Sequence, residues 1–388
     1  MAPAESSSSQ PTFTGEAALK LALQGRKAWN EWAENQSNAG RSVEFSSANL
    51  QELATTGKDG GEQIDFQGFI FPGALTFTNC IFSIRGNFAN ATFKGSADFQ
   101  GATFEGSAGF QGATFEGSAH FRGATFKQSA VFYRATFKET ADFLGATFER
   151  SARFQDATFE ESAHFSDTTF KELAIFFGAT FQMNARFARA SFLRTANFSE
   201  STFMEVADFS GCEFTGPVTL AESQFSASPP DFRNTLFKLH VTLHGMHVGT
   251  PSEHAGEHAD RYRRLKELAA TARDHDRAQA FFANEMRAKR GYETRGLARL
   301  PNWIYQVLSH YGKSLLRPAL ALLATWLVAA AVYFLLACGW CAVSRDSWRA
   351  AWETLAAALY YSALMLVPAL PMSRPRLTAL EDTLFGSD

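Results

Sequence analysis

The sequence predicts an all-β solenoid, a quadrilateral β-helix of about eight coils, with a capping helix before it and an α-helical, apolar tail after it. A phenylalanine recurs in alternating steps of five and six residues, and a small side chain stands two positions before almost every one. The 388-residue chain has 39 Phe but only 8 Tyr and 7 Trp, so one aromatic residue type serves one repeated geometric role.

The Phe register runs without interruption from Phe66 to Phe214, and its unit reads A-T-F-x-x-S-A-x-F-x-G. In a short strand, residues i−2 and i point to one side and their neighbours to the other. We therefore expect Ala and Phe to fill an interior while Thr and charged residues face water. Alternating steps of five and six predict four sides and 22 residues per coil, with coils spaced by about 4.8 Å.

Beyond Phe214 the register weakens but can still be followed. It continues through Leu220 and Phe225 and, after one inserted residue, through Phe232, Phe237, Leu243 and Val248. We assign residues 45–250 to the β-helix. Since each coil buries its apolar side only against neighbouring coils, both ends need caps.

The segments around the repeat have other compositions. Residues 1–12 are rich in Ser and are expected to be disordered. Residues 13–44 form the N-terminal cap, with one amphipathic helix over 15–35, and residues 51–63 are expected to be a loop. Residues 251–300 are predicted to be a linker followed by two helices that meet near Asp274.

The C-terminal tail carries the pattern of a membrane protein. A juxtamembrane helix is expected over 301–317, followed by 26 uncharged residues over 318–343, enough to span a bilayer. Residues 354–372 form a second spanning or re-entrant helix, and 373–388 a terminal tail. The basic residues flanking these segments are Lys313, Arg317, Arg374 and Arg376. By the positive-inside rule they place the β-helix on the cytoplasmic side of the inner membrane.

The repeat unit resembles the pentapeptide-repeat family, in the variant whose spacing alternates between five and six residues. Trp29, Asn30 and Trp32 resemble the W-N-x-W helix that often precedes such repeats. The resemblance implies a right-handed β-helix and leaves function open, because a solenoid is a frame on which sites are placed. The run RYRRLKEL…AFFANEMRAKR, with WIYQVLSHYGKSLLRP after it, resembles the juxtamembrane region of bacterial membrane-anchored members.

No pattern of catalytic residues or phosphate-binding glycines is visible, so we expect neither an enzyme nor a cofactor. No metal site is expected either, and the weak candidates are His254 and His258, spaced i, i+4. Folding the repeat into coils brings apolar and aromatic residues around an arginine on one face, which predicts an interface with a protein partner. These candidate partner-binding residues are Val131, Tyr133, Arg153, Ile175 and Phe177.

The sequence therefore favours a membrane-tethered scaffold for protein–protein interaction, with lipid contacts through the tail. One alternative is an oligomeric membrane pore or channel-like component, and another is a DNA-mimic protein that binds a topoisomerase. With 36 basic and 39 acidic side chains the net charge is only −3, which argues against a nucleic-acid partner. The partner's identity stays open at this point, as does homo-oligomerisation.

Overall fold

The computed structural model describes residues 12–45, 50–57, 60–249, 257–292, 299–309, 311 and 316–339. The chain divides into two units, Met1–Arg299 and Leu300–Asp388. The helical elements are α1 (Gly15–Leu23), α2 (Arg26–Glu34), the 3₁₀ turns η1 (Gln36–Asn38) and η2 (Leu50–Leu53), α3 (Glu257–Thr271), α4 (His275–Tyr292), α5 (Arg299–Ser309) and α6 (Leu316–Gly339).

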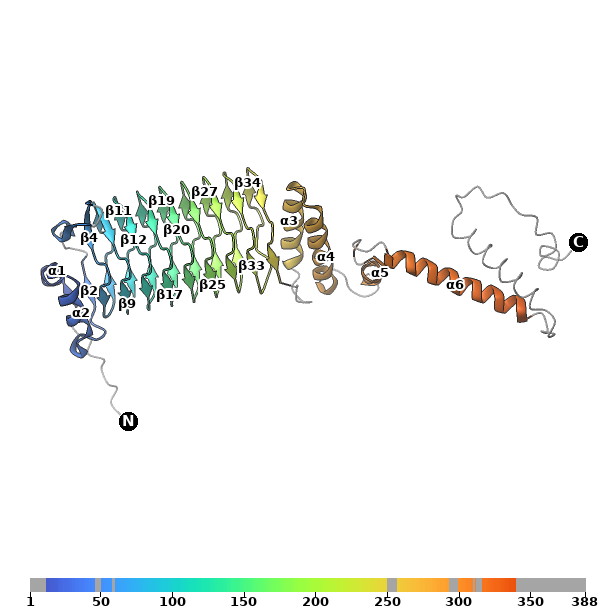
Figure 1. The fold of residues 1–388 in the computed structure, drawn as a ribbon, viewed down its shortest axis with the longest axis horizontal. Coiled ribbons are helices and arrows are strands. Elements are labelled where there is room, and N and C mark those ends of the chain that lie inside the picture. The colour runs from blue at the N-terminus through green and yellow to red at the C-terminus, as the bar shows by residue number, and fades with distance from the viewer. Residues whose placement is uncertain are drawn as a thin grey trace, which may run out of the picture. The chain divides into compact units, whose positions relative to one another are not determined.

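The first unit is a β-solenoid of about eight coils built from four sheets, with helices at both ends (Figure 1). The β10 sheet contains β1 (Phe13–Thr14), β2 (Val43–Glu44), β6 (Leu75–Thr76), β10 (Ala97–Asp98), β14 (Ala119–His120), β18 (Ala141–Asp142), β22 (Ala163–His164), β26 (Ala185–Arg186) and β30 (Ala207–Asp208). The β11 sheet contains β7 (Ile81–Phe82), β11 (Thr103–Phe104), β15 (Thr125–Phe126), β19 (Thr147–Phe148), β23 (Thr169–Phe170), β27 (Ser191–Phe192), β31 (Glu213–Phe214) and β34 (Leu236–Phe237).

The other two sheets complete the coil. The β12 sheet contains β3 (Ala54–Thr56), β4 (Glu62–Asp65), β8 (Arg85–Asn87), β12 (Ala108–Gly109), β16 (Ala130–Val131), β20 (Ala152–Arg153), β24 (Ala174–Ile175), β28 (Ala196–Asn197), β32 (Val218–Thr219) and β35 (Val241–Thr242). The β13 sheet contains β5 (Ile70–Phe71), β9 (Thr92–Phe93), β13 (Thr114–Phe115), β17 (Thr136–Phe137), β21 (Thr158–Phe159), β25 (Thr180–Phe181), β29 (Thr202–Phe203), β33 (Gln224–Phe225) and β36 (His247–Val248).

The coil register agrees with the predicted period. Ala97 pairs with Ala119 in parallel neighbouring strands, which is one step of 22 residues. In the last coil the step grows by one residue, because Phe214 pairs with Phe237. The predicted insertion before Phe232 is therefore confirmed, and it shifts the register of the last coil without breaking its strands.

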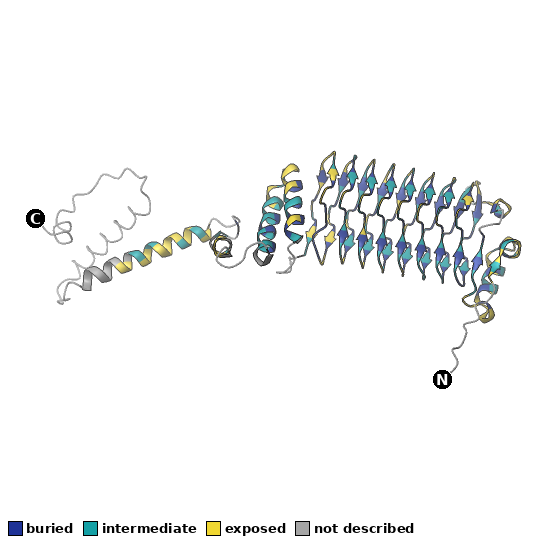
Figure 2. Ribbon diagram, turned by 180° about the vertical axis from the view of Figure 1, so that it is seen from behind, coloured by how far each residue is buried: buried dark blue, intermediate teal, exposed yellow. Residues whose placement is uncertain are grey.

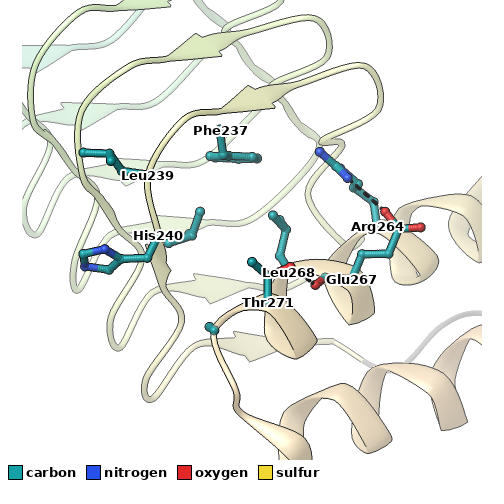
Figure 3. A pocket seen from close by; sticks show the side chains of 9 residues that line it. Phe237, Leu239, His240, Arg264, Glu267, Leu268 and Thr271 are labelled. Atoms are coloured by element: carbon teal, nitrogen blue, oxygen red, sulfur yellow. Dashed lines mark hydrogen bonds and ion pairs between the residues drawn. The ribbon is translucent and has the colours of Figure 1, made fainter.

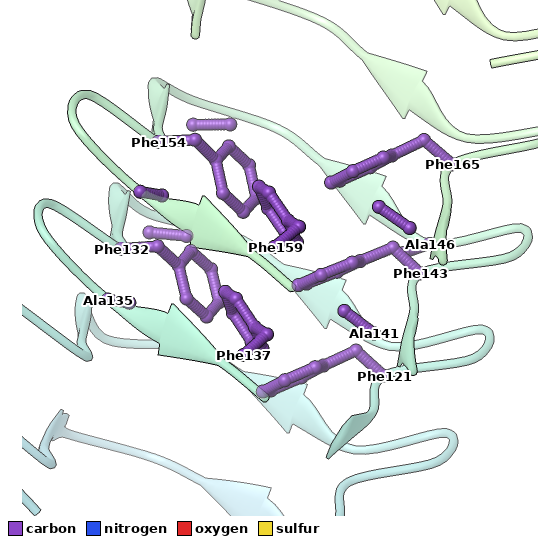
Figure 4. Close-up of a cluster of buried hydrophobic side chains, with 14 of the residues drawn as sticks. Phe121, Phe132, Ala135, Phe137, Ala141, Phe143, Ala146, Phe154, Phe159 and Phe165 are labelled. Carbon is purple, nitrogen blue, oxygen red and sulfur yellow. The ribbon is translucent and has the colours of Figure 1, made fainter. Parts of the chain in front are cut away.

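Phenylalanine rings fill the interior as continuous stacks, such as that of Phe121, Phe143 and Phe165 on successive coils in Figure 4. Phe132 and Phe154 on successive coils are parallel within 1°, with ring centroids 4.8 Å apart. Within a coil, Phe132 meets Phe143 edge to face at 5.4 Å and 88°. Both arrangements are favoured by the quadrupoles of the rings. The prediction that Ala and Phe point inward is confirmed, since Ala130, Phe132 and their equivalents are fully buried.

The two-helix cap at the N-terminal end differs from the single helix predicted there. Gly25 has φ 87°, a left-handed conformation open to glycine, and it separates α1 from α2. The Trp29 indole N–H then donates to the Ile70 carbonyl at 2.8 Å. Asn30 donates to the Gly68 carbonyl and accepts the Ile70 N–H, both at 2.9 Å. These bonds satisfy backbone groups of the first coil, which has no coil before it.

Residues 51–63 do not form the predicted loop throughout. β3 and β4 form an antiparallel hairpin, and β4 also pairs in parallel with β8 through Ile64 and Gly86. Ile64 is buried two residues before Phe66 and so occupies the inward position that Ala holds in later coils. The sequence pattern missed this strand because a large β-branched residue replaces the small one.

Backbone hydrogen bonds run in opposite directions on alternate sheets. In the β11 and β13 sheets an N–H donates to the preceding coil, as Thr114 does to the Ala91 carbonyl at 2.9 Å. In the β10 and β12 sheets it donates to the following coil, as Ala97 does to the Ser118 carbonyl at 2.8 Å. The last coil therefore leaves carbonyl groups open along the β11 and β13 sheets, and a cap there must supply donors.

The α3–α4 hairpin supplies those donors. The Arg264 guanidinium donates to the Thr235 carbonyl at 2.9 Å, and Arg277 to the Met246 carbonyl at 2.9 Å. The Tyr262 hydroxyl donates to the Gly249 carbonyl at 2.8 Å. Burial raises the pKa of the Tyr262 phenol, so this hydroxyl remains a donor at neutral pH.

A buried ion cluster joins the two helices of this cap. The Glu285 carboxylate is only 2% exposed and meets Lys266 and Lys289 at 2.8 Å and Arg263 at 3.2 Å. Burial acts to raise the pKa of Glu285, but hydrogen bonds from Lys266 and Lys289 outweigh it and leave that pKa below its ordinary value. The carboxylate therefore stays ionised and holds α3 against α4.

The second unit contains α5 and α6. Figure 2 shows exposed positions along α6, and the exposed apolar residues of this helix include Leu320, Leu323 and Val328. Among the described residues, no helix is both long enough and apolar enough to cross a bilayer. This finding gives no support to the membrane span predicted over 318–343. Residues 340–343 of the predicted span lie outside the described residues, which end at Gly339. The segments 1–11, 354–372 and 373–388 lie outside the described residues.

Candidate partner-binding surface

Three predicted interface residues form one column on the outer surface of the β12 sheet. Val131 in β16 pairs with Arg153 in β20, and Arg153 pairs with Ile175 in β24. Each is the second residue of a two-residue strand whose first residue is a buried Ala. Because side chains alternate along a strand, the burial of Ala fixes the outward direction of all three.

A second column lies two residues further along each of these coils and holds Tyr133, Gln155 and Phe177. The Arg134 N–H donates to the Gln155 carbonyl at 2.9 Å, and the Asp156 N–H to the Phe177 carbonyl at 3.0 Å, which places the three residues on successive rungs. The Tyr133 and Phe177 side chains are 38% and 36% exposed. We name the two columns together the aromatic face, which comprises Val131, Tyr133, Arg153, Gln155, Ile175 and Phe177.

The aromatic face is confined to three coils. On the preceding coil the equivalent positions are Gly109 and Gln111, and on the following coil they are Asn197 and Ser199. The Asn197 carboxamide oxygen accepts the Ser199 N–H at 2.9 Å, as is usual for Asn in a turn. Small or polar residues thus bound the apolar columns on both sides, and the face is a discrete patch.

One edge of the aromatic face is electrostatically balanced. The Arg134 guanidinium lies 4.9 Å from the centroid of the Tyr133 ring and pairs with the Asp156 carboxylate at 3.6 Å. Sequence reasoning missed both residues. The signal was present, since Arg134 directly follows Tyr133 and Asp156 stands one coil period later. Arg134 holds the Tyr133 ring by a cation–π contact.

The middle of the aromatic face is not balanced. Arg153 is exposed and has no ion pair with any residue that the structure describes. Gln155, on the same coil, has a carboxamide oxygen that is buried and has no hydrogen-bond partner among the described residues. Buried polar atoms without a partner are uncommon in folded proteins. The face thus combines apolar area with one free cation and one unsatisfied acceptor.

The outer surfaces of the β11 and β13 sheets have a different character. Glutamate and lysine alternate from coil to coil, so that Lys127 meets Glu105 at 2.9 Å and Lys171 meets Glu149 at 3.0 Å on the β11 side. On the β13 side, Lys138 meets Glu116 at 3.2 Å. We call these columns charge ladders. Paired charges at the spacing of the coils keep those surfaces polar and close to neutral.

The β10 sheet presents titratable side chains outward. His164 stands between Asp142 and Arg186 in register. Burial and the Arg186 charge lower the pKa of His164, and Asp142 partly opposes them. At a nearby corner, a hydrogen bond from Arg189, 2.7 Å away, lowers the pKa of the Asp167 carboxyl. No group of three or more His, Cys, Asp or Glu side chains in the described chain is arranged to hold a metal ion.

The remaining sequence candidates fall at the ends of the described segments or beyond them. His258 lies in α3 of the C-terminal cap, while His254 lies outside the described residues. Arg317 is exposed in the first turn of α6. Lys313, Arg374 and Arg376 also lie outside the described residues, so the structure does not place them.

A small hollow of about 140 Å³ lies between the last coil and α3, and Figure 3 shows its lining. Phe237 and Leu239 come from the coil, and Arg264, Glu267 and Leu268 from the helix. Arg264 is engaged by Glu267 at 2.9 Å and by the last coil's backbone. Ligand sites are usually several hundred Å³, so this hollow is a packing gap beneath the cap.

Comparison with protein-family models gives one family. The model described as pentapeptide repeats (9 copies) matches in overlapping stretches, 66–114, 88–136, 110–158, 132–180, 154–202, 176–224 and 198–247. Searches of curated proteins and of solved structures returned no match. The matched residues are those that form the stacked coils described above. The solenoid over residues 66–247 of this chain is therefore a pentapeptide-repeat domain.

Proposed function

We propose that this protein is a non-catalytic, membrane-tethered scaffold that binds a protein partner through the aromatic face. The observation that carries the proposal is the exposure of Tyr133 and Phe177 beside Arg153, on a surface whose backbone is fixed by the coil register. Aromatic residues and arginine are enriched at the centres of protein interfaces. A preformed surface also loses little conformational entropy on binding.

The other described surfaces support this choice of face. The charge ladders on the β11 and β13 sheets alternate in sign, as in the pair Lys138 and Glu116. A mimic of DNA needs carboxylates in long uniform rows, because phosphates repeat without cations between them. The ladders therefore favour a scaffold that binds protein over a DNA mimic.

The proposed tether is the C-terminal tail. Its support is the uncharged sequence over 318–343 and the exposed apolar side chains of α6, among them Leu322 and Leu327. Basic residues on the solenoid side of this segment, including Arg317, favour the cytoplasmic face of the inner membrane for the β-helix. Apolar surface of this kind is costly in water and is stabilised by lipid.

Photo-crosslinking in intact cells tests the partner-binding surface. The photoreactive residue p-benzoylphenylalanine is placed at Tyr133 or Phe177 of the full chain. The control position is Leu144, a half-buried residue that follows Phe143 in the turn after β18 as Tyr133 follows Phe132 after β16. We expect one discrete protein adduct from positions 133 and 177 and none from 144. Equal labelling at the three positions, or none at 133 and 177, contradicts the proposal.

Carbonate extraction tests the tether separately. The full chain should stay with the membrane pellet, and the double substitution L322R and L327R on α6 should release it to the supernatant. The matched control is the double substitution L236R and L239R, at two comparably exposed leucines of the solenoid. A wild-type chain that is itself extracted by carbonate would refute the tether and leave the partner-binding proposal standing.

A further inference from the structure

Arg153 is the only charged residue of the aromatic face, and its column neighbours are Val131 and Ile175. The pairing of charges seen elsewhere on the solenoid is missing here. Lys127, Lys138 and Lys171 each meet a glutamate one coil away, whereas the residues one coil away from Arg153 are aliphatic. The guanidinium is therefore left available, with apolar area around it that a bound molecule would remove from water.

We propose that the partner presents a short segment in which a carboxylate is flanked by apolar side chains, and that this carboxylate pairs with Arg153. The inference rests on the proposed function and adds the chemistry of the partner. An arginine set in an apolar surface attracts a carboxylate strongly, because the planar guanidinium forms two parallel hydrogen bonds with it. A partner without an acid would bury Arg153 unpaired, which is unfavourable.

Gln155 adds a second requirement. Its buried, unpartnered carboxamide oxygen lies on the same coil as Arg153. A hydrogen-bond donor on the partner next to its carboxylate would satisfy this group once the carboxamide turns outward. Satisfying an otherwise unpaired polar group favours the correct partner over one that lacks the donor.

The size of the face indicates a segment instead of a second copy of this chain. Its three rungs are separated by 4.8 and 4.9 Å, measured between the stacked rings of Phe132, Phe154 and Phe176. The face therefore extends only about 10 Å along the solenoid, a strip too narrow for the roughly 800 Å² per partner that a stable interface buries. A twofold axis through the face would also bring Arg153 of each copy toward the other, and like charges repel.

The solenoid offers a matched control for Arg153. Arg186 is likewise the exposed second residue of a two-residue strand that begins with a buried Ala, in β26 of the β10 sheet. Its column neighbours are His164 and Asp208, so it lies in polar surroundings. Charge reversal at Arg186 therefore reproduces the change in net charge without altering the aromatic face.

The test uses a phage-displayed library of random dodecapeptides, selected on the full chain in lipid nanodiscs. We expect enrichment of peptides with Asp or Glu between aromatic or aliphatic residues. Arg153→Glu should weaken a selected peptide at least about tenfold, as expected for a desolvated charge pair, while R186E leaves it unchanged. A lysine-for-acid version of the peptide should bind R153E better than wild type.

Other outcomes overturn the inference. They are an enriched sequence without acids, no enrichment at all, equal losses in R153E and R186E, or self-association of the chain that R153E abolishes. The crosslinking experiment separates failure of this inference from failure of the proposed function. If positions 133 and 177 crosslink a partner in cells and the adduct persists unchanged in R153E, the scaffold stands and the acidic segment is wrong.

Discussion

Replacing Phe148 by alanine removes one ring from the middle of a continuous stack. In the structure Phe148 is fully buried between Phe126 and Phe170, at centroid distances of 4.7 and 5.0 Å and within 2° of parallel. It also meets Phe154 edge to face at 6.0 Å. The substitution therefore deletes two stacking contacts, one edge contact and a tilted contact with Phe143 at 6.3 Å, and it leaves a cavity.

The size of the effect follows from these contacts. Burial of a phenylalanine side chain contributes about 1.5–3 kcal/mol to the free energy of unfolding. Each aromatic pair adds about 0.5–1.5 kcal/mol. The coils cannot move together to fill the gap, because backbone bonds such as Lys171 N–H to the Phe148 carbonyl at 2.8 Å hold their spacing. We expect a loss of about 4 kcal/mol, within the usual range for Phe→Ala.

Phe237 in the last coil is the matched control. It is only partly buried and stacks on one side alone, against Phe214 at 5.0 Å. F237A should therefore cost about half as much as F148A. Urea denaturation of the full chain in detergent, followed by circular dichroism of the strands, gives both free energies. The inward stacking of Phe is refuted if F148A costs less than about 1 kcal/mol or if F237A costs more than F148A.

Three further predictions concern the cap, the corners and the charge ladders. The lowered pKa of Glu285 means that its contribution to cap stability is full above about pH 4.3, the ordinary value, and is lost as pH falls below it. The protection factors of amides in α3 and α4, which correct for the slower intrinsic exchange at lower pH, should therefore fall on acidification in wild type and fall less in E285Q. Gly145→Ala should cost about 1 kcal/mol in thermal unfolding, because φ is +67° with open space around it. Gly145→Asn should lower the stability less than Gly145→Ala, since Asn79 holds φ 56° at the equivalent corner of an earlier coil. Equal losses for the two substitutions would contradict backbone strain as the cause. Lys127→Glu should lower the stability of the solenoid at low salt, and a loss that persists undiminished in about 1 M salt would contradict an ionic ladder.

The sequence by itself determined the coil, its period and the direction of its side chains. Phe132 and Phe154 could be placed on successive rungs because they are 22 residues apart in the Phe register. Ala130 could be placed inside with them because side chains alternate along a strand, so residues two apart share the buried side. The outward column of Val131, Arg153 and Ile175 followed from the same rule. These features depend on local geometry repeated many times.

The tertiary structure decided what depends on contacts between different segments. The break at Gly25, the strand at Ile64 and the arginines that reach the open carbonyls of the last coil lie outside the repeat, so its period could not predict them. The tertiary structure also decided whether Arg153 has an ionic partner. An outward side chain pairs or stays free according to its neighbours one coil away, and only stacking the coils brings those neighbours within reach of a charge.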